Sequence, residues 1–317
     1  LQDCVAARLA LGPALDKAFK QLPPQSQLPP QLYVQHWLDL AQAFPWQCVL
    51  VAEEVVWRVG TEEALLEGKA QALVPWHVRK LEVLVHFVRA QRASQGEQPP
   101  PSVRQSSLLR ALLVVAVAHR DIAQLLQEHQ VSDLADFHWA RQLKYHLGSP
   151  HTTCQNLLQD PTSSAPTRTS LSPAACWIDV LGRSVFYNYE YLGPRLGLLP
   201  SLLPERPALV LLLALEEVAC GALLGPAGVG KAATVKSLAQ ALGRQLVVLP
   251  CFPQIEARSL SRCLHGALQG GAWLLLRAAQ HLPLGLLSAL GQRLAELRHL
   301  YAPLYQEASR NTSTVDP

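Results

Sequence analysis

The chain has 317 residues, of which 49% are apolar and 16% are charged, and its formal net charge is +3. This composition is typical of a globular protein with one large or two smaller domains, and it excludes an intrinsically disordered chain. The small net charge, without any dense run of Lys or Arg, argues against a nucleic-acid partner.

The seven cysteines are scattered, and none forms a CxxC pair or lies near a His at the spacing of metal ligands. We therefore expect reduced thiols in a cytoplasmic chain and no metal site. The most apolar stretch, 208–224, contains Glu216 and Glu217, whereas a membrane span needs about 20 apolar residues without such charges. No membrane partner is expected. The absence of methionine, even at position 1, indicates a piece of a longer protein.

The first part of the chain is predicted to be a helical region, 1–147. Its apolar residues recur at i, i+3 and i+4 spacing over 33–40, 61–69, 74–92 and 108–127. Stretches rich in Pro, Ser and Gln interrupt the sequence at 21–31, 91–107 and 148–174. The last of these is the longest, and we expect a disordered loop over 148–175.

The pattern changes at Cys176, where CWIDVLGRSVFYNYEYLG alternates and is rich in aromatic and β-branched residues. With Gly182-Arg183 at the turn, it predicts a β-hairpin. Helices and strands then alternate: a helix from about 207, a strand at 219–224, a helix at 231–242, a strand at 245–251, a helix at 259–269, a strand at 272–277 and a helix at 284–300. This order predicts an α/β domain over 176–305, with a parallel sheet and flanking helices, followed by a tail at 306–317.

A glycine-rich loop lies between the predicted strand 219–224 and the helix that follows it. The pattern GxxxxGK supplies backbone N–H groups that can surround phosphate oxygens and a lysine for the β- and γ-phosphates. We therefore predict ATP or ADP as the ligand. The predicted binding residues are Gly225, Pro226, Ala227, Gly228, Val229, Gly230, Lys231 and Ala232.

Two groups that nucleotide hydrolysis needs are absent. The residue after Lys231 normally carries a hydroxyl that binds Mg²⁺, but here it is Ala232, with Thr234 two places further on. A second metal-binding group, an Asp, is expected at the end of strand 272–277, where Arg277 stands instead. Mg²⁺ binding and a catalytic residue are therefore not predicted.

These absences leave three interpretations open. The loop is a structural relic, or Arg277 replaces the metal charge and joins the predicted binding residues, or hydrolysis proceeds by another route.

Other polar residues do not form a recognisable catalytic set. His119, Arg120 and Asp121 are adjacent, so on a helix they point in different directions and are expected to pack or cap. His77 and His86 are expected to be partly buried on a helix. The tryptophans are predicted to belong to the core: Trp37, Trp46, Trp57 and Trp76.

Several segments resemble the dynein heavy chain family. YNYEYLG at 187–193 resembles the YGYEYLG motif that opens the first AAA+ module of that family, and 225–251 is similar to its GPAGTGKTET segment. Three upstream segments resemble the family's linker, namely WLDLAQAFPWQCVLVAEEVVW, AHRDI and DFHWARQLKYHL. The resemblance extends over 31–300 and implies the C-terminal part of a linker followed by a truncated AAA+ module.

The departures from the family pattern fall in the nucleotide site. The family has GKT where this chain has Gly230-Lys231-Ala232, and it has Asp and Glu where this chain has Arg277 and Ala278. We therefore identify a divergent family member whose module binds nucleotide without hydrolysing it. The alternatives are an ATP-hydrolysing microtubule motor subunit and a nucleotide-gated scaffold. The resemblance implies other dynein-type subunits and microtubules as partners, and a place in the cytoskeleton, including the axoneme of cilia and flagella.

Overall fold

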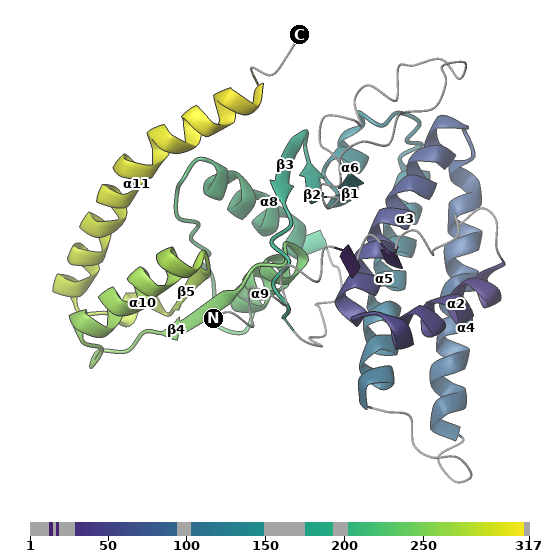
Figure 1. Cartoon of the computed structure of the whole chain (residues 1–317), viewed down its shortest axis with the longest axis horizontal. Coiled ribbons are helices and arrows are strands. Elements are labelled where there is room, and N and C mark those ends of the chain that lie inside the picture. The colour runs from purple at the N-terminus through teal and green to yellow at the C-terminus, as the bar shows by residue number, and fades with distance from the viewer. Residues whose placement is uncertain are drawn as a thin grey trace. The chain divides into compact units, whose positions relative to one another are not determined.

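The computed structural model describes residues 13–14, 17–18, 29–93, 103–148, 175–192 and 202–313. The chain divides into two compact units, Leu1–Pro200 and Ser201–Pro317, whose elements are labelled in Figure 1. Most of the predicted disordered loop lies outside the described residues. The predicted domain limits remain predictions.

In the described residues, the first unit has the long helices α2 (Pro30–Ala43), α3 (Trp46–Leu66), α4 (Leu73–Ala93) and α5 (Val103–Glu128). It also contains the short helical turns η2 (Ala70–Ala72) and α6 (Phe137–Ala140). Three of the predicted helices are present, and each is longer than predicted.

Helix α3 was predicted only in its last turns, because its apolar residues do not follow a helical period. In its first three turns, residues on every side are buried, among them Trp46, Val49, Ala52 and Val56. A helix that is apolar all round is typical of a protein interior and has no amphipathic pattern to detect. Pro45 separates it from α2, because proline disfavours the helical conformation of the residue before it, and Phe44 is extended (φ −121°, ψ 158°).

A three-stranded antiparallel sheet follows, in the order β1 (Lys144–Gly148), β2 (Ala175–Val180) and β3 (Arg183–Phe186). The predicted hairpin is confirmed, but its turn lies one residue earlier, at Leu181 and Gly182. Both have positive φ, 53° and 73°, as tight hairpin turns that match the strand twist require. Strand β1 is a difference from the prediction, which places residues up to 147 in the helical region. Its partner β2 is distant in the sequence, so no local pattern indicates this strand.

The second unit contains α8 (Leu202–Glu216), α9 (Lys231–Ala241), β4 (Leu246–Pro250), α10 (Ala257–Gly270), β5 (Trp273–Arg277), η3 (Ala279–His281) and α11 (Leu284–Ser313). Strands β4 and β5 pair in parallel, from Leu246 opposite Trp273 to Pro250 opposite Arg277. Figure 1 shows α10 as the connection between them. A hydrophobic core cluster of the second unit contains Cys251, Ile255, Leu260, Leu282 and Leu290.

The strand predicted at 219–224 is not formed, so the parallel sheet has two strands in the described residues. A strand requires a neighbour that completes its backbone hydrogen bonds, and the described residues provide none for this segment. The segment lies against α8 instead: a Cβ on Gly221 would lie 2.2 Å from Leu211 Cδ2. The α/β prediction holds for β4, α10 and β5.

Among the described helices, none is both long and apolar enough to cross a membrane. The five cysteines in the described residues are all free thiols, and Cys4 and Cys154 lie outside that part of the chain.

Candidate functional site

The glycine loop connects α8 to α9 and is exposed from Gly225 to Val229. Gly228 and Gly230 both have φ of 85°, a left-handed conformation that residues with a Cβ rarely adopt. Gly230 is also the residue that caps α9. The two glycines therefore let the chain turn directly from the loop into the helix.

The end of the loop coincides with the positive end of the α9 dipole. The first N–H groups of a helix have no partner within it, so the start of an eleven-residue helix attracts anions. Lys231 is the first residue of α9, and its Nζ donates hydrogen bonds to the backbone oxygens of Gly225 (2.7 Å) and Pro226 (2.5 Å). The ammonium group thus lies across the loop that is predicted to bind phosphate.

Thr234 does not replace the hydroxyl that Ala232 lacks. Its Oγ1 donates to the backbone oxygen of Gly230 at 3.2 Å, one helical turn back, and the residue is only 8% exposed. A Thr hydroxyl committed to this local bond is turned away from a ligand in front of the helix. The loop therefore offers no side-chain oxygen for a metal ion at this position.

Arg277 is the last residue of β5 and is exposed. Its backbone oxygen accepts a hydrogen bond from Cys251 N–H at 2.9 Å, so its main chain is fixed by the sheet. Helix α9 packs against β5. No described residue pairs with the Arg277 guanidinium, and its role in the predicted nucleotide site remains a prediction.

The described residues contain no group of three His, Cys, Asp or Glu side chains that could hold a metal ion. Positions 278–282, directly after β5, carry no carboxylate. The backbone N–H groups at the start of α9 and Lys231 are groups of the kind that binds nucleotide phosphates, and the expectation for Mg²⁺ remains a prediction.

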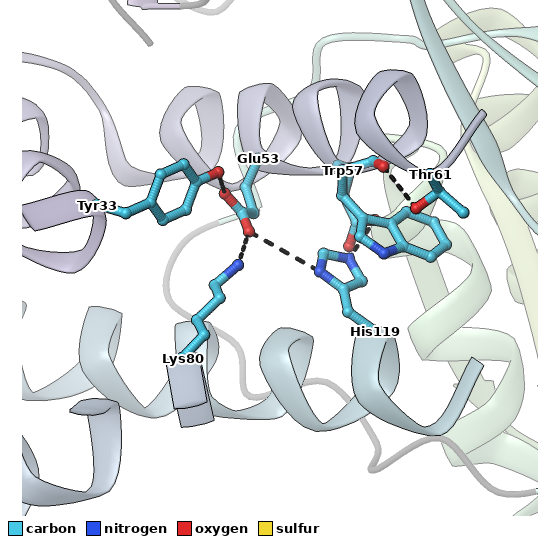
Figure 2. A network of polar contacts seen from close by, with 7 residues as sticks. Tyr33, Glu53, Trp57, Thr61, Lys80 and His119 are labelled. Carbon is cyan, nitrogen blue, oxygen red and sulfur yellow. Dashed lines mark hydrogen bonds and ion pairs between the residues drawn. The ribbon is translucent and has the colours of Figure 1, made fainter. Parts of the chain in front are cut away.

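A second concentration of polar groups lies in the helical unit, on side chains of α2, α3, α4 and α5 (Figure 2). Glu53 of α3 accepts a hydrogen bond from Tyr33 Oη of α2 (2.7 Å) and forms an ion pair with Lys80 of α4. His119 of α5 lies with Nδ1 3.8 Å from the Glu53 carboxylate and Nε2 3.1 Å from that of Glu54. We call these five residues the buried cluster.

Burial dominates the electrostatics of the buried cluster. It lowers the pKa of His119 well below its usual value, and the nearby Lys80 charge lowers it further, so the imidazole is neutral. The His119 ring stacks on Trp57 with centroids 4.2 Å apart and planes 2° apart. Burial also raises the pKa of Glu54 to about 7.

Glu53, Lys80 and His119 are at most 3% exposed and are therefore out of reach of a substrate, while the Glu54 side chain, at the edge of the cluster, is 22% exposed. The Glu53 carboxylate is paired with Lys80 and Tyr33, as a buried charge must be, whereas His119 Nδ1 makes no hydrogen bond to the described residues. Sequence reasoning missed Glu53 and Lys80; the one available signal was a carboxylate inside a nearly continuous apolar helix.

The structure separates His119 from its sequence neighbours, as predicted. Arg120 Nη2 forms an ion pair with Asp121 at 2.5 Å, and both side chains are at least 30% exposed. His77 is buried, but His86 is exposed, which contradicts the prediction for that residue. Three of the tryptophans are buried as predicted, namely Trp37, Trp46 and Trp57, while Trp76 is half-buried.

Comparison with known proteins finds a family match over the segment that contains the glycine loop. The model of the family described as the hydrolytic ATP binding site of the dynein motor region matches residues 187–309. Over all 317 residues, the chain is 76% identical to dynein heavy chain domain-containing protein 1 of Homo sapiens and 64% identical to that of Mus musculus. It is 28% identical over 265 residues, 83% of its length, to dynein axonemal heavy chain 3 of Homo sapiens.

The chain spans only 7% of the length of the first two relatives and 6% of the third. The predicted resemblance to dynein heavy chains, and to a divergent member of that family, is confirmed.

Proposed function

We propose that this dynein-heavy-chain-like chain holds ATP or ADP at residues 225–232 without hydrolysing it. One combination of features at α9 carries the proposal. A glycine loop leads into the helix, and Lys231, its first residue, places its ammonium group on that loop. The next residue, Ala232, has no metal-binding hydroxyl. Binding and turnover therefore depend on different residues, and this chain retains only those for binding.

The second part of the proposal concerns Arg277. In the sequence pattern, it stands at the end of β5, where a metal-binding Asp is expected. A guanidinium group pairs well with phosphate oxygens and can offset their charge without a metal ion. We therefore assign to Arg277 the charge that Mg²⁺ provides in a hydrolysing site.

The chain acts, in this proposal, within a microtubule-based assembly. The relatives named above include an axonemal dynein, and others are cytoplasmic dyneins, among them the heavy chain of cytoplasmic dynein 2 in Homo sapiens. By this similarity we propose other dynein-type subunits and microtubules as partners of the longer protein, in the cytoskeleton and in the axoneme of cilia and flagella.

A second candidate function is ATP hydrolysis by a motor subunit. The family description, which names a hydrolytic site, favours it. It requires a water-activating group and a metal-binding group that positions 277–282 do not carry. A chain with Ala232→Thr and Arg277→Asp separates the two functions: our proposal expects this double variant to gain Mg²⁺-dependent binding that the native chain lacks.

Titration calorimetry of the full chain with ATP and with ADP tests the assignment of the site. We expect Lys231→Ala and Arg277→Ala each to weaken binding by about 10-fold or more, the loss typical of a charge-assisted hydrogen bond. Lys236→Ala and Arg293→Ala serve as controls, since both residues are exposed on helices of the same unit. Equal binding by all four variants contradicts the site, and phosphate release by the native chain favours the motor.

A further inference from the structure

The segment 187–192 lies in the first compact unit, although the match to the ATP-binding family begins at residue 187. It follows β3 and has no helix or strand of its own. The first residues of the ATP-binding region are therefore packed with the helical unit, and something other than regular structure must hold them there.

One side chain makes three hydrogen bonds to this segment. Gln47, in the first turn of α3, donates from Nε2 to Tyr187 Oη (2.7 Å) and to the backbone oxygen of Glu190 (2.8 Å). Its Oε1 accepts from the backbone N–H of Leu192 at 3.1 Å. The orientation of the amide is fixed, because only nitrogen can donate to Glu190 and only oxygen can accept from Leu192.

Neighbouring contacts reinforce this attachment. Trp46 Nε1 donates to Tyr191 Oη at 3.1 Å, and their ring centroids are 6.4 Å apart. The Tyr189 hydroxyl accepts from the backbone N–H of Cys176 at 2.7 Å, at the start of the hairpin. Each tyrosine of the segment is thus bonded through its hydroxyl to another part of the first unit.

Burial makes the Gln47 contacts strong determinants of position. Gln47 is 8% exposed and Tyr187 is 6% exposed. A buried amide that loses its partners cannot recover them from water, so alternative positions of the segment are disfavoured.

We propose that Gln47 is the positioning residue that fixes residues 187–192 to the first turn of α3. The first residues of the ATP-binding region are then held by the helical unit. This role does not depend on nucleotide binding, because none of the residues involved belongs to the glycine loop.

Residue-resolved hydrogen exchange on the full chain tests this proposal. In Gln47→Leu, we expect the Leu192 amide to exchange at least about fivefold faster, the factor that corresponds to loss of one typical hydrogen bond. The Ile178 amide, inside the hairpin, should keep its native rate. Gln35→Leu is the control, since Gln35 is exposed and its side chain bonds only to Asp39 among the described residues.

Gln47→Glu separates the two ends of the amide. A carboxylate can still accept from Leu192 but cannot donate to Tyr187 or Glu190, so Leu192 should stay more protected than in Gln47→Leu. Tyr187→Phe leaves α3 unchanged and covers the case in which the Gln47 variants do not fold; it should accelerate Leu192 exchange by about twofold or more, because it loosens Gln47. Native Leu192 exchange in the folded Gln47→Leu chain overturns the proposal, as does native exchange in Tyr187→Phe.

Discussion

The glycine loop and the buried cluster concentrate polar groups in opposite ways. In the glycine loop, Lys231 is half-buried, and among the described residues its ammonium group bonds to two backbone oxygens that a phosphate can displace. In the buried cluster, Glu53 is bonded to both Tyr33 and Lys80 and has no contact with solvent. Buried charges that are bonded to one another have a structural role, and the proposed binding role of the loop rests on a charge whose partners are displaceable.

The difference also assigns separate tasks to the two units. Polar residues of the helical unit join four helices, so their loss should lower stability. Those of the loop contribute little to packing, so their loss should affect ligand binding. The following predictions test this division.

The largest effect is expected for Lys80→Met. The substitution leaves the Glu53 carboxylate buried without its counter-charge, which typically costs about 3–5 kcal/mol of unfolding free energy. Urea unfolding followed by tryptophan fluorescence reports on this unit, because every tryptophan except Trp273 lies in it. Lys69→Met is the control, since Lys69 pairs with Glu67 on the surface. A loss below about 1 kcal/mol for Lys80→Met contradicts the structural role of the cluster.

Protonation of Glu54 should give the next largest effect. A carboxyl pKa raised to about 7 in the folded state stabilises the protein fully at low pH, and this stability is lost as the pH rises through 7. The difference of about 2.5 between this pKa and the ordinary value of 4.5 corresponds to at most about 3.4 kcal/mol.

Glu54→Gln removes this dependence, so its unfolding free energy should fall less than that of the native chain between pH 5 and 8. Glu63→Gln, on an exposed position of the same helix, is the control. The buried His77 and His119 have the opposite effect. Burial lowers their pKa values, so they stabilise the fold fully above about pH 6.5, and this contribution is lost as the pH falls through their lowered pKa values. Identical profiles for Glu54→Gln and the native chain would exclude a raised pKa at Glu54.

A smaller effect is expected at Gly230. Its φ of 85° costs a residue with a Cβ about 1–2 kcal/mol, so Gly230→Ala should destabilise the second unit by that amount. Gly266→Ala provides a control of opposite sign, because Gly266 lies inside α10 with open space around it. There the substitution should stabilise by about 0.5–1 kcal/mol. Hydrogen exchange of the paired β4 and β5 amides, which reports on the second unit alone, distinguishes the two variants.

The smallest effect on stability is expected for Lys231→Met. The side chain is bonded only to exposed loop carbonyls, so the free energy of unfolding should change by less than about 0.5 kcal/mol. The same variant should lose nucleotide binding. A large loss of stability would mean that Lys231 is a structural residue and would weaken the distinction between the two regions.

The sequence predicted local features well where period and spacing carry the information. Helices α4 and α5, the hairpin β2–β3 and the alternation of β4, α10 and β5 follow from such patterns. The strand at 219–224 was wrong, because strand formation depends on a partner and not on the apolar run itself.

The candidate site was predicted unevenly for a similar reason. The loop spacing identified 225–232, but no pattern could show that Lys231 folds back on the loop or that the Thr234 hydroxyl is committed to Gly230. The buried cluster and the Gln47 contacts join residues far apart in the chain, and no short motif records such pairs.

The most direct test of the central claim is the affinity of the full chain for ATP with Mg²⁺ and with EDTA, measured together with phosphate release. We expect the two affinities to agree within about twofold and no phosphate to be released, because Ala232 and Arg277 provide no oxygen ligand for a metal ion. Affinity that requires Mg²⁺ and is followed by phosphate release would contradict it, as would the absence of binding under both conditions.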